Sequence, residues 1–318
     1  MKSRAQKRKK RWKARYTIIT VIVLLFILFA NFVASGNLPF FLQSPLNNLN
    51  RATGGLFSTS SDGNLTADKF SVHFIDIGQG DSELIWCGGE GMMIDGGPNA
   101  SDGKAEQYAA AHGITKLKYI VPTHPDEDHV GGLTNVVQKL SVQYAIMTDA
   151  TANTRTFENL VKTIKQRQIP IIRAKAGAHY TLGSASFTIL GPVKEYDDTN
   201  DMSIVLKLQY KGVSFLFTGD APIRAESDMM QSGENLSATV LKVGHHGSKT
   251  ATSQAFLQAV NPKYAIVSVG KDNHYGLPDG IVLNRLKQMN IQTYRTDEKG
   301  TIVMQENQPG KLTIKSER

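Results

Sequence analysis

The sequence contains a single cysteine, Cys87, among its 318 residues. One cysteine cannot build a disulfide framework or a cysteine-based zinc site, so both are excluded. Cys87 ends the strand-like stretch 83–87, and this setting favours a buried, unreactive thiol over a catalytic one.

A surplus of positive charge is also lacking outside the N-terminus, although the formal net charge is +8. Nine of the 36 Lys and Arg residues lie in residues 1–15, so the rest of the chain has 27 basic residues against 28 acidic ones. This near balance excludes a global electrostatic argument for nucleic-acid binding, while local basic patches remain open.

Residues 16–34 form an apolar run without a charged residue. At 1.5 Å per residue it comes close to the roughly 30 Å thickness of a bilayer core, which predicts a transmembrane anchor. The positive-inside rule then keeps the basic tail 1–15 in the cytoplasm and places the rest outside the cell, as a single-pass protein of the cell membrane. Two alternatives are a signal peptide cleaved near residues 34–36 and a nucleic-acid-binding role for the basic tail.

Residues 35–67 are rich in Ser, Gly, Asn and Thr, which is typical of a flexible linker. In residues 68–318, short apolar runs alternate with helix-like windows, and several of the runs come in adjacent pairs. The pattern predicts one domain with two sheets covered by helices rather than a doubly wound parallel sheet. The expected helices are 103–112, 130–140, 155–168, 222–231, 252–260 and 279–289.

The densest group of metal-capable side chains lies in the run 119–132, between an expected strand and an expected helix that begins at His129 or just after it. Its members are His124, Asp126, Asp128 and His129. Imidazole suits zinc, iron or manganese, and carboxylates suit harder ions such as manganese. The set exceeds what one four-coordinate ion needs, which predicts a two-metal centre. The alternative is an acidic loop with Asp128 as a helix N-cap.

Residues 124–129 resemble the signature His-x-His-x-Asp-His of the metallo-β-lactamase fold family, with Asp126 in place of the second histidine. With Asp at that position and Gly-Gly following, the run is similar to the hydrolase domain of ComEC-type competence proteins and their free-standing relatives. Further segments occur in the order expected for the family, at 74–82, 93–97, 200–206, 217–220 and 241–248. The resemblance spans residues 69–306 and implies an α/β fold of the αββα sandwich type.

The resemblance also implies two divalent ions, zinc or manganese. The predicted ligands are His124, Asp126, Asp128, His129, Asp220 and His245. The first ion falls to His124 and Asp126, the second to Asp128 and the two remaining histidines, and Asp220 bridges both. Asp128 and Asp220 receive the catalytic role, with a bridging hydroxide as the nucleophile. Asp220 and His245 each follow an apolar strand, so their side chains are expected at one sheet edge.

Residues expected to support or replace these ligands are Asp81, Asp95, Asp201, His246 and His274. Asp81 and Asp95 are interpreted as partners that orient histidines or the loop, or as ordinary turn residues. Two departures from the family pattern concern the others. The third motif lacks a histidine and offers only residues 199–201. The pattern Tyr-Gly-His-Pro reads Tyr275-Gly-Leu277-Pro278, with His274 just before it, which leaves the substrate open.

Two-metal chemistry suits hydrolysis of phosphodiesters, lactones or thioesters. The resemblance implies a nuclease that degrades a DNA strand at the cell surface during DNA uptake. Because one span cannot form a channel, separate channel or competence proteins are the expected partners. Ser248 and Lys249 are expected to bind substrate, and Lys242 and Lys271 either contact phosphates or are simply solvated. Alternatives are a hydrolase of small or cell-wall esters, of phosphorylcholine or lactone type, and a non-catalytic binding module on the same fold.

Overall fold

The computed structural model describes residues 69–318. The predicted tail, anchor and linker at 1–15, 16–34 and 35–67 lie outside the described residues. Within the described part of the chain, no helix is long and apolar enough to cross a membrane.

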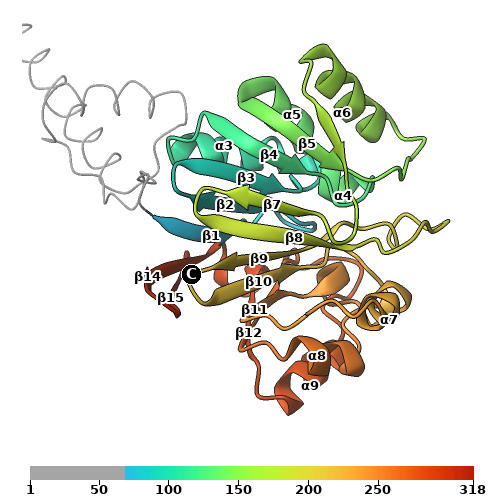
Figure 1. The fold of residues 1–318 in the computed structure, drawn as a ribbon, viewed down its shortest axis with the longest axis vertical. Helices are drawn as coiled ribbons and strands as arrows, with labels where there is room; N and C mark the ends of the chain where they lie inside the picture. Colours follow the sequence, from blue (N-terminus) through green and yellow to red (C-terminus); the bar gives the residue numbers. More distant parts are fainter. Residues whose placement is uncertain (1–68) are drawn as a thin grey trace, which may run out of the picture. The chain divides into compact units, whose positions relative to one another are not determined.

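Two mixed β-sheets form the centre of the domain (Figure 1). The first has eight strands in the order β15-β14-β1-β2-β3-β4-β5-β6. These strands are β1 (Phe70–Phe74), β2 (Glu83–Cys87), β3 (Glu90–Ile94), β4 (Lys116–Val121), β5 (Ser141–Met147), β6 (Ile171–Arg173), β14 (Ile302–Gln308) and β15 (Lys311–Ser316).

The second sheet has seven strands in the order β13-β12-β11-β10-β9-β8-β7. They are β7 (His179–Leu182), β8 (Ala185–Gly191), β9 (Val205–Tyr210), β10 (Val213–Phe217), β11 (Val240–Lys242), β12 (Tyr264–Val267) and β13 (Gln292–Arg295). From β10 to β13 all neighbouring pairs are parallel.

Helices cover the outer face of each sheet (Figure 1). The first sheet carries η1 (Asn99–Ser101), α3 (Lys104–Ala111), α4 (Glu127–Val130), α5 (Leu133–Lys139) and α6 (Arg155–Gln166). The second carries α7 (Ile223–Gln231), η2 (Gly244–Gly247), α8 (Gln254–Val260), α9 (Gly280–Gln288) and α10 (Thr296–Lys299).

The two sheets and the two sets of helices form four layers, and three apolar clusters lie between them. One lies between the sheets, and each of the others lies between a sheet and its helices. Alternation along the strands produces this arrangement: Phe215 and Phe217 of β10 join the central cluster, while Leu216 between them faces the helices. Across the centre, Phe70 stacks on Tyr210 with ring centroids 4.3 Å apart. Burial of each such ring stabilises the fold by about 1.5–3 kcal/mol.

The predicted two-sheet α/β sandwich is therefore confirmed. Two edge strands, β7 and β15, were not predicted, because their residues alternate only between exposed and half-buried positions over most of their length.

The helix expected at 130–140 is divided in two. Its first part, α4, begins at Glu127 rather than at His129, and the N-cap is Asp126 rather than Asp128, without a side-chain capping bond. The division falls at Gly131 and Gly132, where the chain approaches other backbone too closely for a side chain.

Strand direction brings distant segments to one end of the sandwich. β3 and β4 are parallel, and β1 runs in the same direction because it pairs antiparallel with β2, which pairs antiparallel with β3. The loops that follow the C-terminal ends of these strands therefore meet at one end of the sheet. A bond of 2.9 Å from Ile204 N to Thr123 O joins this end to the second sheet.

Gly132 tests the close approach beneath α5. A Cβ at this position would lie 2.0 Å from Gly96 O, a backbone atom that cannot rotate away. We expect Gly132→Ala to lower the free energy of unfolding by about 1–3 kcal/mol, as overpacking does. Urea unfolding measures this change. Gly280→Ala is the control, since a Cβ there meets nothing within 4 Å. Equal stability of the two variants would show that the contact between Gly132 and Gly96 leaves room for a side chain.

Candidate metal centre

Four histidines and one aspartate from both sheets converge at this end of the sandwich. His124 follows β4 and His129 lies in α4. Asp220 follows β10, while His245 and His246 lie in η2 after β11. All are buried except His245, whose side chain is 30% exposed.

The first group of potential ligands surrounds His124. Its Nε2 lies 3.7 Å from Asp126 Oδ2 and 4.0 Å from Asp220 Oδ2. Two ligand atoms at about 2.1 Å from one tetrahedral ion lie roughly 3.4 Å apart, so small shifts would bring these atoms to one ion. His124, His129 and Asp220 also form a group whose ligand atoms all lie within 4.8 Å of one another.

The second group contains Asp128, His129 and His246. His246 Nε2 lies 3.2 Å from Asp128 Oδ2, and His129 Nε2 lies 3.3 Å from Asp220 Oδ1. His246 Nε2 is also 3.8 Å from Asp220 Oδ2. Asp220 therefore lies between the two groups and can serve both.

The choice within the histidine pair differs from the prediction. The sequence favoured His245, but His246 is the one that lies beside Asp128 and belongs to the second group. His245 remains at the rim, with its Nε2 3.6 Å from Asp220 Oδ2. Both residues have left-handed φ angles, 49° and 53°, and this turn places His246 inward and His245 toward solvent.

Asp95 fixes the orientation of the His129 ring. Its Oδ2 accepts a hydrogen bond of 2.8 Å from His129 Nδ1, and its Oδ1 accepts one of 2.8 Å from Thr123 N. Thr123 Oγ1 donates to Asp95 Oδ2 at 2.7 Å and lies 3.1 Å from His124 Nδ1. An Nδ1–H bound to a carboxylate leaves the Nε2 lone pair of His129 free to face the cluster, which is the usual arrangement for a metal-ligating histidine.

Asp81 and Lys242 support His246 in the same way. His246 Nδ1 lies 3.0 Å from Ser268 O and 3.2 Å from Asp81 Oδ1. The other oxygen of Asp81 pairs with Lys242 Nζ at 2.5 Å, and Lys242 is only 1% exposed. Lys242 also donates to Val243 O at 2.9 Å. It is therefore a buried partner of Asp81 and not a surface contact for phosphates.

The unpartnered atoms of the cluster fit a metal. His124 Nε2, His129 Nε2 and Asp220 Oδ1 are buried, and none of them forms a hydrogen bond with a described residue, although the last two atoms lie 3.3 Å apart. Unpaired buried polar atoms are rare and call for a missing partner. Their chemistry, two imidazole nitrogens and a carboxylate oxygen, is the donor set that divalent transition metals use in proteins.

The electrostatics also call for a cation. Burial, and then the neighbouring His129, lowers the pKa of His124 to about 3, which keeps this ring neutral. Burial opposes charge on His246, but Asp220 and Asp81 raise its pKa to about 10. Burial also opposes the charge on Asp220, yet His129 and His246 hold its pKa well below the usual value. Protons on imidazole thus balance buried carboxylates, and a divalent cation can replace them.

The third motif lies beside the first group without joining it. Thr199 Oγ1 donates to Asp126 Oδ1 at 3.3 Å. Asp201 instead pairs with Arg224. Its Oδ1 accepts a hydrogen bond of 2.8 Å from Arg224 Nε, and its Oδ2 lies 2.8 Å from Arg224 Nη2, so both carboxylate oxygens are occupied. Asn200 Oδ1 is buried without a hydrogen-bond partner among the described residues.

The remaining predicted residues lie at the rim. Ser248 Oγ lies 2.9 Å from Thr250 Oγ1, and Lys249 is exposed. Lys271 and His274 are also exposed, and His274 belongs to none of the metal-capable groups among the described residues.

Sequence reasoning missed three buried residues near the cluster: Thr123, Glu83 and Ser268. Thr123 directly precedes His124, so its position at a strand end was a usable signal. Glu83 Oε1 has no partner within the described range, and burial together with Asp81 raises its pKa well above the usual value. Ser268 contacts His246 through its backbone carbonyl oxygen, and the identity of a residue gives no signal for such a backbone contact.

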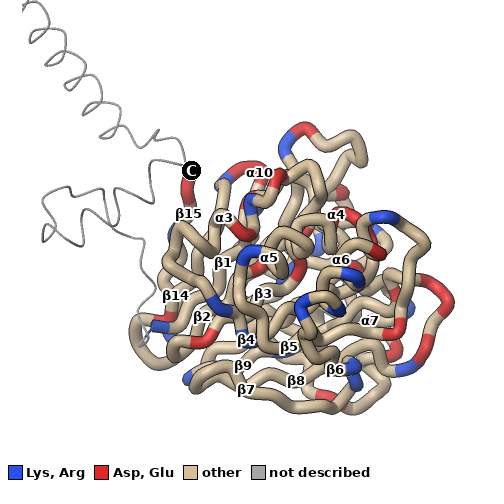
Figure 2. The backbone as a smooth tube through the Cα atoms, turned by 90° about the horizontal axis from the view of Figure 1, so that it is seen from above, with Lys and Arg blue, Asp and Glu red and all other residues tan. Residues whose placement is uncertain are grey.

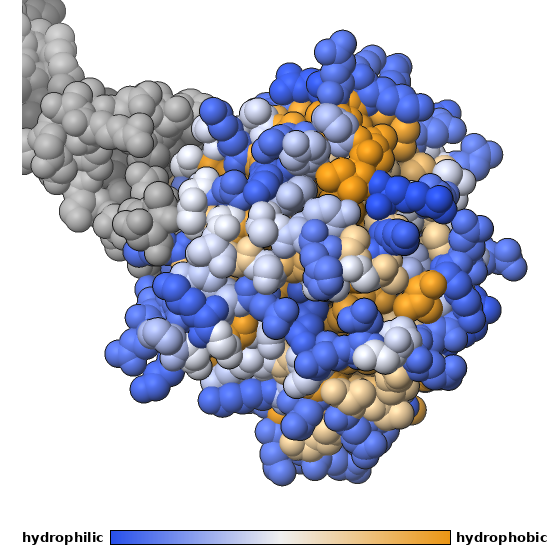
Figure 3. All heavy atoms as spheres, in the orientation of Figure 1, coloured by the Kyte–Doolittle hydropathy of each residue, from blue (hydrophilic) through white to orange (hydrophobic). Residues whose placement is uncertain are grey.

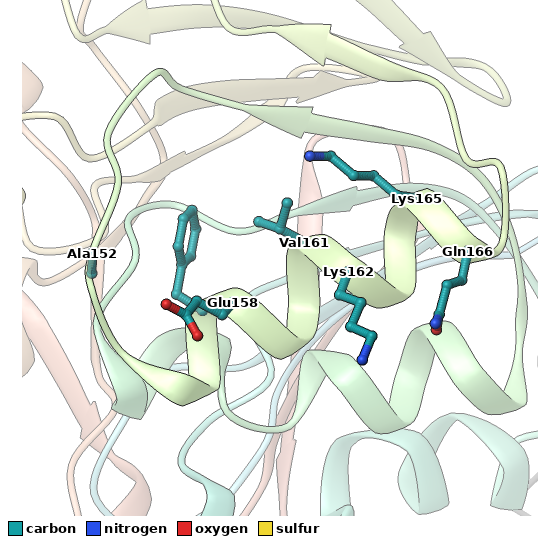
Figure 4. A pocket seen from close by; sticks show the side chains of 7 residues that line it. Ala152, Glu158, Val161, Lys162, Lys165 and Gln166 are labelled. Carbon is teal, nitrogen blue, oxygen red and sulfur yellow. The ribbon is translucent and has the colours of Figure 1, made fainter.

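A groove of about 480 Å³ on the outer surface of the first sheet is separate from this centre. Its lining comes mainly from α6, as Figure 4 shows, and includes Phe157, Val161 and Lys165. Figure 3 shows hydrophobic surface in the region that Figure 1 assigns to α5 and α6. None of the lining residues belongs to the metal-capable groups.

Comparison with known proteins assigns the class. A family model described as the metallo-beta-lactamase superfamily matches residues 75–271, and the chain belongs to this superfamily. The fold and the clustered His and Asp side chains define a metal-dependent hydrolase that is related to competence proteins.

Two curated relatives make that relationship specific. ComE operon protein 3 of Bacillus subtilis (strain 168) is 31% identical over 250 residues, which cover 73% of this chain and 32% of that protein. Competence protein ComA of Neisseria gonorrhoeae is 32% identical over 241 residues, covering 74% of this chain and 32% of that protein. The predicted ComEC-type resemblance is confirmed, and the chain spans about a third of the length of these relatives.

A solved structure supports the fold alone. The chain is similar to CmlA, a diiron beta-hydroxylase from Streptomyces venezuelae, with a TM-score of 0.50 and 10% identity. The similarity covers 79% of this chain and 58% of that one.

Lys242 provides a test of the buried support. Lys242→Met leaves the Asp81 carboxylate buried without its cation, so we expect the free energy of unfolding to fall by about 3–5 kcal/mol. Urea unfolding at a fixed metal concentration measures it. The control is Lys287→Met, which removes an exposed lysine of α9. If both variants lose the same stability, Lys242 has no such role.

Proposed function

We propose that this domain is a phosphodiesterase that hydrolyses a DNA strand with two divalent ions, zinc or manganese, shared through Asp220. We further propose that it acts outside the cell from a single membrane anchor at 16–34, beside separate channel or competence proteins. The relationship to competence proteins supports the choice of DNA.

The observation that carries the two-ion proposal is the position of Asp220. Its Oδ1 lies 3.3 Å from His129 Nε2, and its Oδ2 lies 4.0 Å from His124 Nε2 and 3.8 Å from His246 Nε2, so the carboxylate lies beside histidines of both groups. We assign His124, Asp126 and Asp220 to one ion. We assign Asp128, His129 and His246 to the second ion, which shares Asp220 with the first.

When bound, two such ions polarise a phosphoryl oxygen and lower the pKa of water to about 7. The chain's own contribution is orientation. Asp95 and Ser268 O hold the Nδ1 atoms of His129 and His246, so that neither ring can turn its Nε2 away. Burial of His124, His129 and Asp220 keeps bulk water away from these side chains and strengthens the charge interactions between them.

A second candidate, hydrolysis of a cationic ester such as a phosphorylcholine-type compound, rests on one groove. This groove, of about 250 Å³, is lined by Asp149, Ala150, Thr151, Glu195, Tyr196, Asp197, Asp198, Thr199 and Met202. It adjoins the centre, because Thr199 donates to Asp126. Acidic side chains repel a phosphate backbone and attract a cation, although Arg173 pairs with Asp149 and Glu195 and offsets part of that charge.

The distribution of charged residues agrees with weak, local DNA binding. In the view of Figure 2, basic and acidic residues are interspersed along the chain. A DNA strand would therefore be held by a few contacts near the centre and not by an extended basic face.

The test uses the full chain with manganese or zinc, offered single-stranded DNA, bis-p-nitrophenyl phosphate and a choline phosphate ester. We expect cleavage of DNA and of bis-p-nitrophenyl phosphate. Asp220→Asn should lower both rates by more than about 100-fold, which exceeds the loss expected from a supporting residue. Chelation with EDTA should abolish both activities, and added metal should restore them.

The control is Asp102→Asn, at an exposed turn after η1, which should keep wild-type rates. Turnover of the choline ester with DNA left intact would replace the nuclease by the second candidate. Binding of metal without cleavage of any of the three compounds would indicate a non-catalytic binding module.

A further inference from the structure

An exposed aromatic pair stands on the loop between β12 and α9. Tyr275 is 63% exposed, the highest value among the large hydrophobic side chains of the described residues. The ring of His274 packs against it, with centroids 4.0 Å apart and an interplanar angle of 33°. Exposing two adjacent rings to water forgoes the free energy that burial of their surface would contribute.

The loop that carries the pair is held rigid by one side chain. Asn273 Nδ2 donates to Gly270 O at 2.9 Å and to Leu277 O at 2.8 Å, and Asn273 Oδ1 accepts from Leu277 N at 3.1 Å. Leu277 packs on the apolar cluster beneath the second sheet's helices. The two exposed rings therefore lie on a turn that is fixed by hydrogen bonds and by the packing of Leu277.

Both ends of the loop contact the segments that build the metal centre. Asp279 N donates to Gly247 O at 2.9 Å, directly after His246. At the other end, Gly270 N donates to Gln79 Oε1 at 3.1 Å, and a Cβ on Gly270 would lie 2.6 Å from Gln79 N. Gln79 belongs to the loop that carries Asp81. The aromatic pair therefore stands on a bridge between two loops of the centre.

The charges at the rim differ from one side of the centre to the other. On the side of Asp126 lies the acidic groove described above. On the side of the bridge, the exposed lysines are Lys271, which is followed by the exposed Asp272, and Lys249 in the loop after η2. The second side is therefore less acidic than the groove, so a polyanion is repelled less there.

We propose that Tyr275, backed by His274, is a stacking platform for a base of a single-stranded polynucleotide, with Lys249 and Lys271 contacting its phosphates. This proposal rests on the proposed nuclease function and names the part of the substrate that the site recognises. Single-strand binding proteins combine basic residues with aromatic rings in this way, and each stacked base contributes without sequence preference.

The size of the exposed group favours a base over a protein partner. A stable protein interface buries about 800 Å² on each side, whereas the other exposed residues of the segment 271–276 are Lys271, Asp272, His274 and Gly276, and the next exposed apolar side chain along the chain is Ile281 in α9. One flat ring is sufficient for a base.

The experiment measures binding of two labelled strands of about 12 nucleotides, one of thymidine and one abasic with the same phosphates, to the full chain. Fluorescence anisotropy with EDTA keeps the strands intact. We expect Tyr275→Ala to weaken binding of the thymidine strand by about 5- to 100-fold and to leave the abasic strand unchanged. Tyr275→Phe should keep wild-type binding. The matched control is Ile171→Ala, which removes an exposed apolar side chain (49%) from edge strand β6.

Kinetics separate the platform from the chemistry. With metal, Tyr275→Ala should raise KM for the thymidine strand with a much smaller effect on kcat, because the ring contacts a base and not the reacting phosphate. Equal weakening of both strands, or none, would overturn the platform even if the wild type cleaves DNA. A change in molecular mass by light scattering without a change in strand binding would overturn it too, since Tyr275 would then belong to a protein contact. Failure of the wild type to cleave any phosphodiester would instead remove the proposed function itself.

Discussion

The burial of the Asp220 carboxylate among histidines is the constraint on which the rest of the centre depends. A buried carboxylate without a positive partner is costly, and Asp81, Asp95 and Asp128 add further negative charge close by. Imidazolium groups and Lys242 supply part of the balance in the metal-free chain. Divalent ions between the histidine Nε2 atoms supply it more completely, which is why the same arrangement serves both stability and chemistry.

The sandwich makes this burial possible. Parallel strands from two sheets end at one edge, so ligands nearly a hundred residues apart in sequence, such as His124 and Asp220, lie about 4 Å apart. The loops are then fixed by backbone and side-chain bonds. Glu226 accepts from Thr252 N and, at 3.0 Å, from Ser253 N, and Thr252 Oγ1 accepts from Gly244 N at 3.1 Å. These bonds hold the η2 turn, whose left-handed residues cost about 1–3 kcal/mol each.

Much of this could be predicted from the sequence, since strand ends and clustered ligand types are local signals. The two-sheet sandwich and the run around His124 were visible in that way. The choice between His245 and His246 was not, because adjacent histidines are separated only by the backbone turn that directs one inward. Lys242 resembled a surface lysine because a charged residue between two apolar ones suggests a strand with one exposed face. In the structure all three residues of β11 are buried, so this alternation does not hold. The break at Gly132 depends on contact with Gly96, which lies in another segment.

The most direct measurement is a crystal structure of the full chain with manganese, recorded at a wavelength where the metal scatters anomalously. The bridging role of Asp220 predicts two anomalous peaks, one on each side of its carboxylate. His124 Nε2 should ligate one ion, and His246 Nε2 the ion that Asp128 binds, at about 2.0–2.2 Å. A single peak, or a second ion bound through His245 with His246 left unliganded, would contradict it.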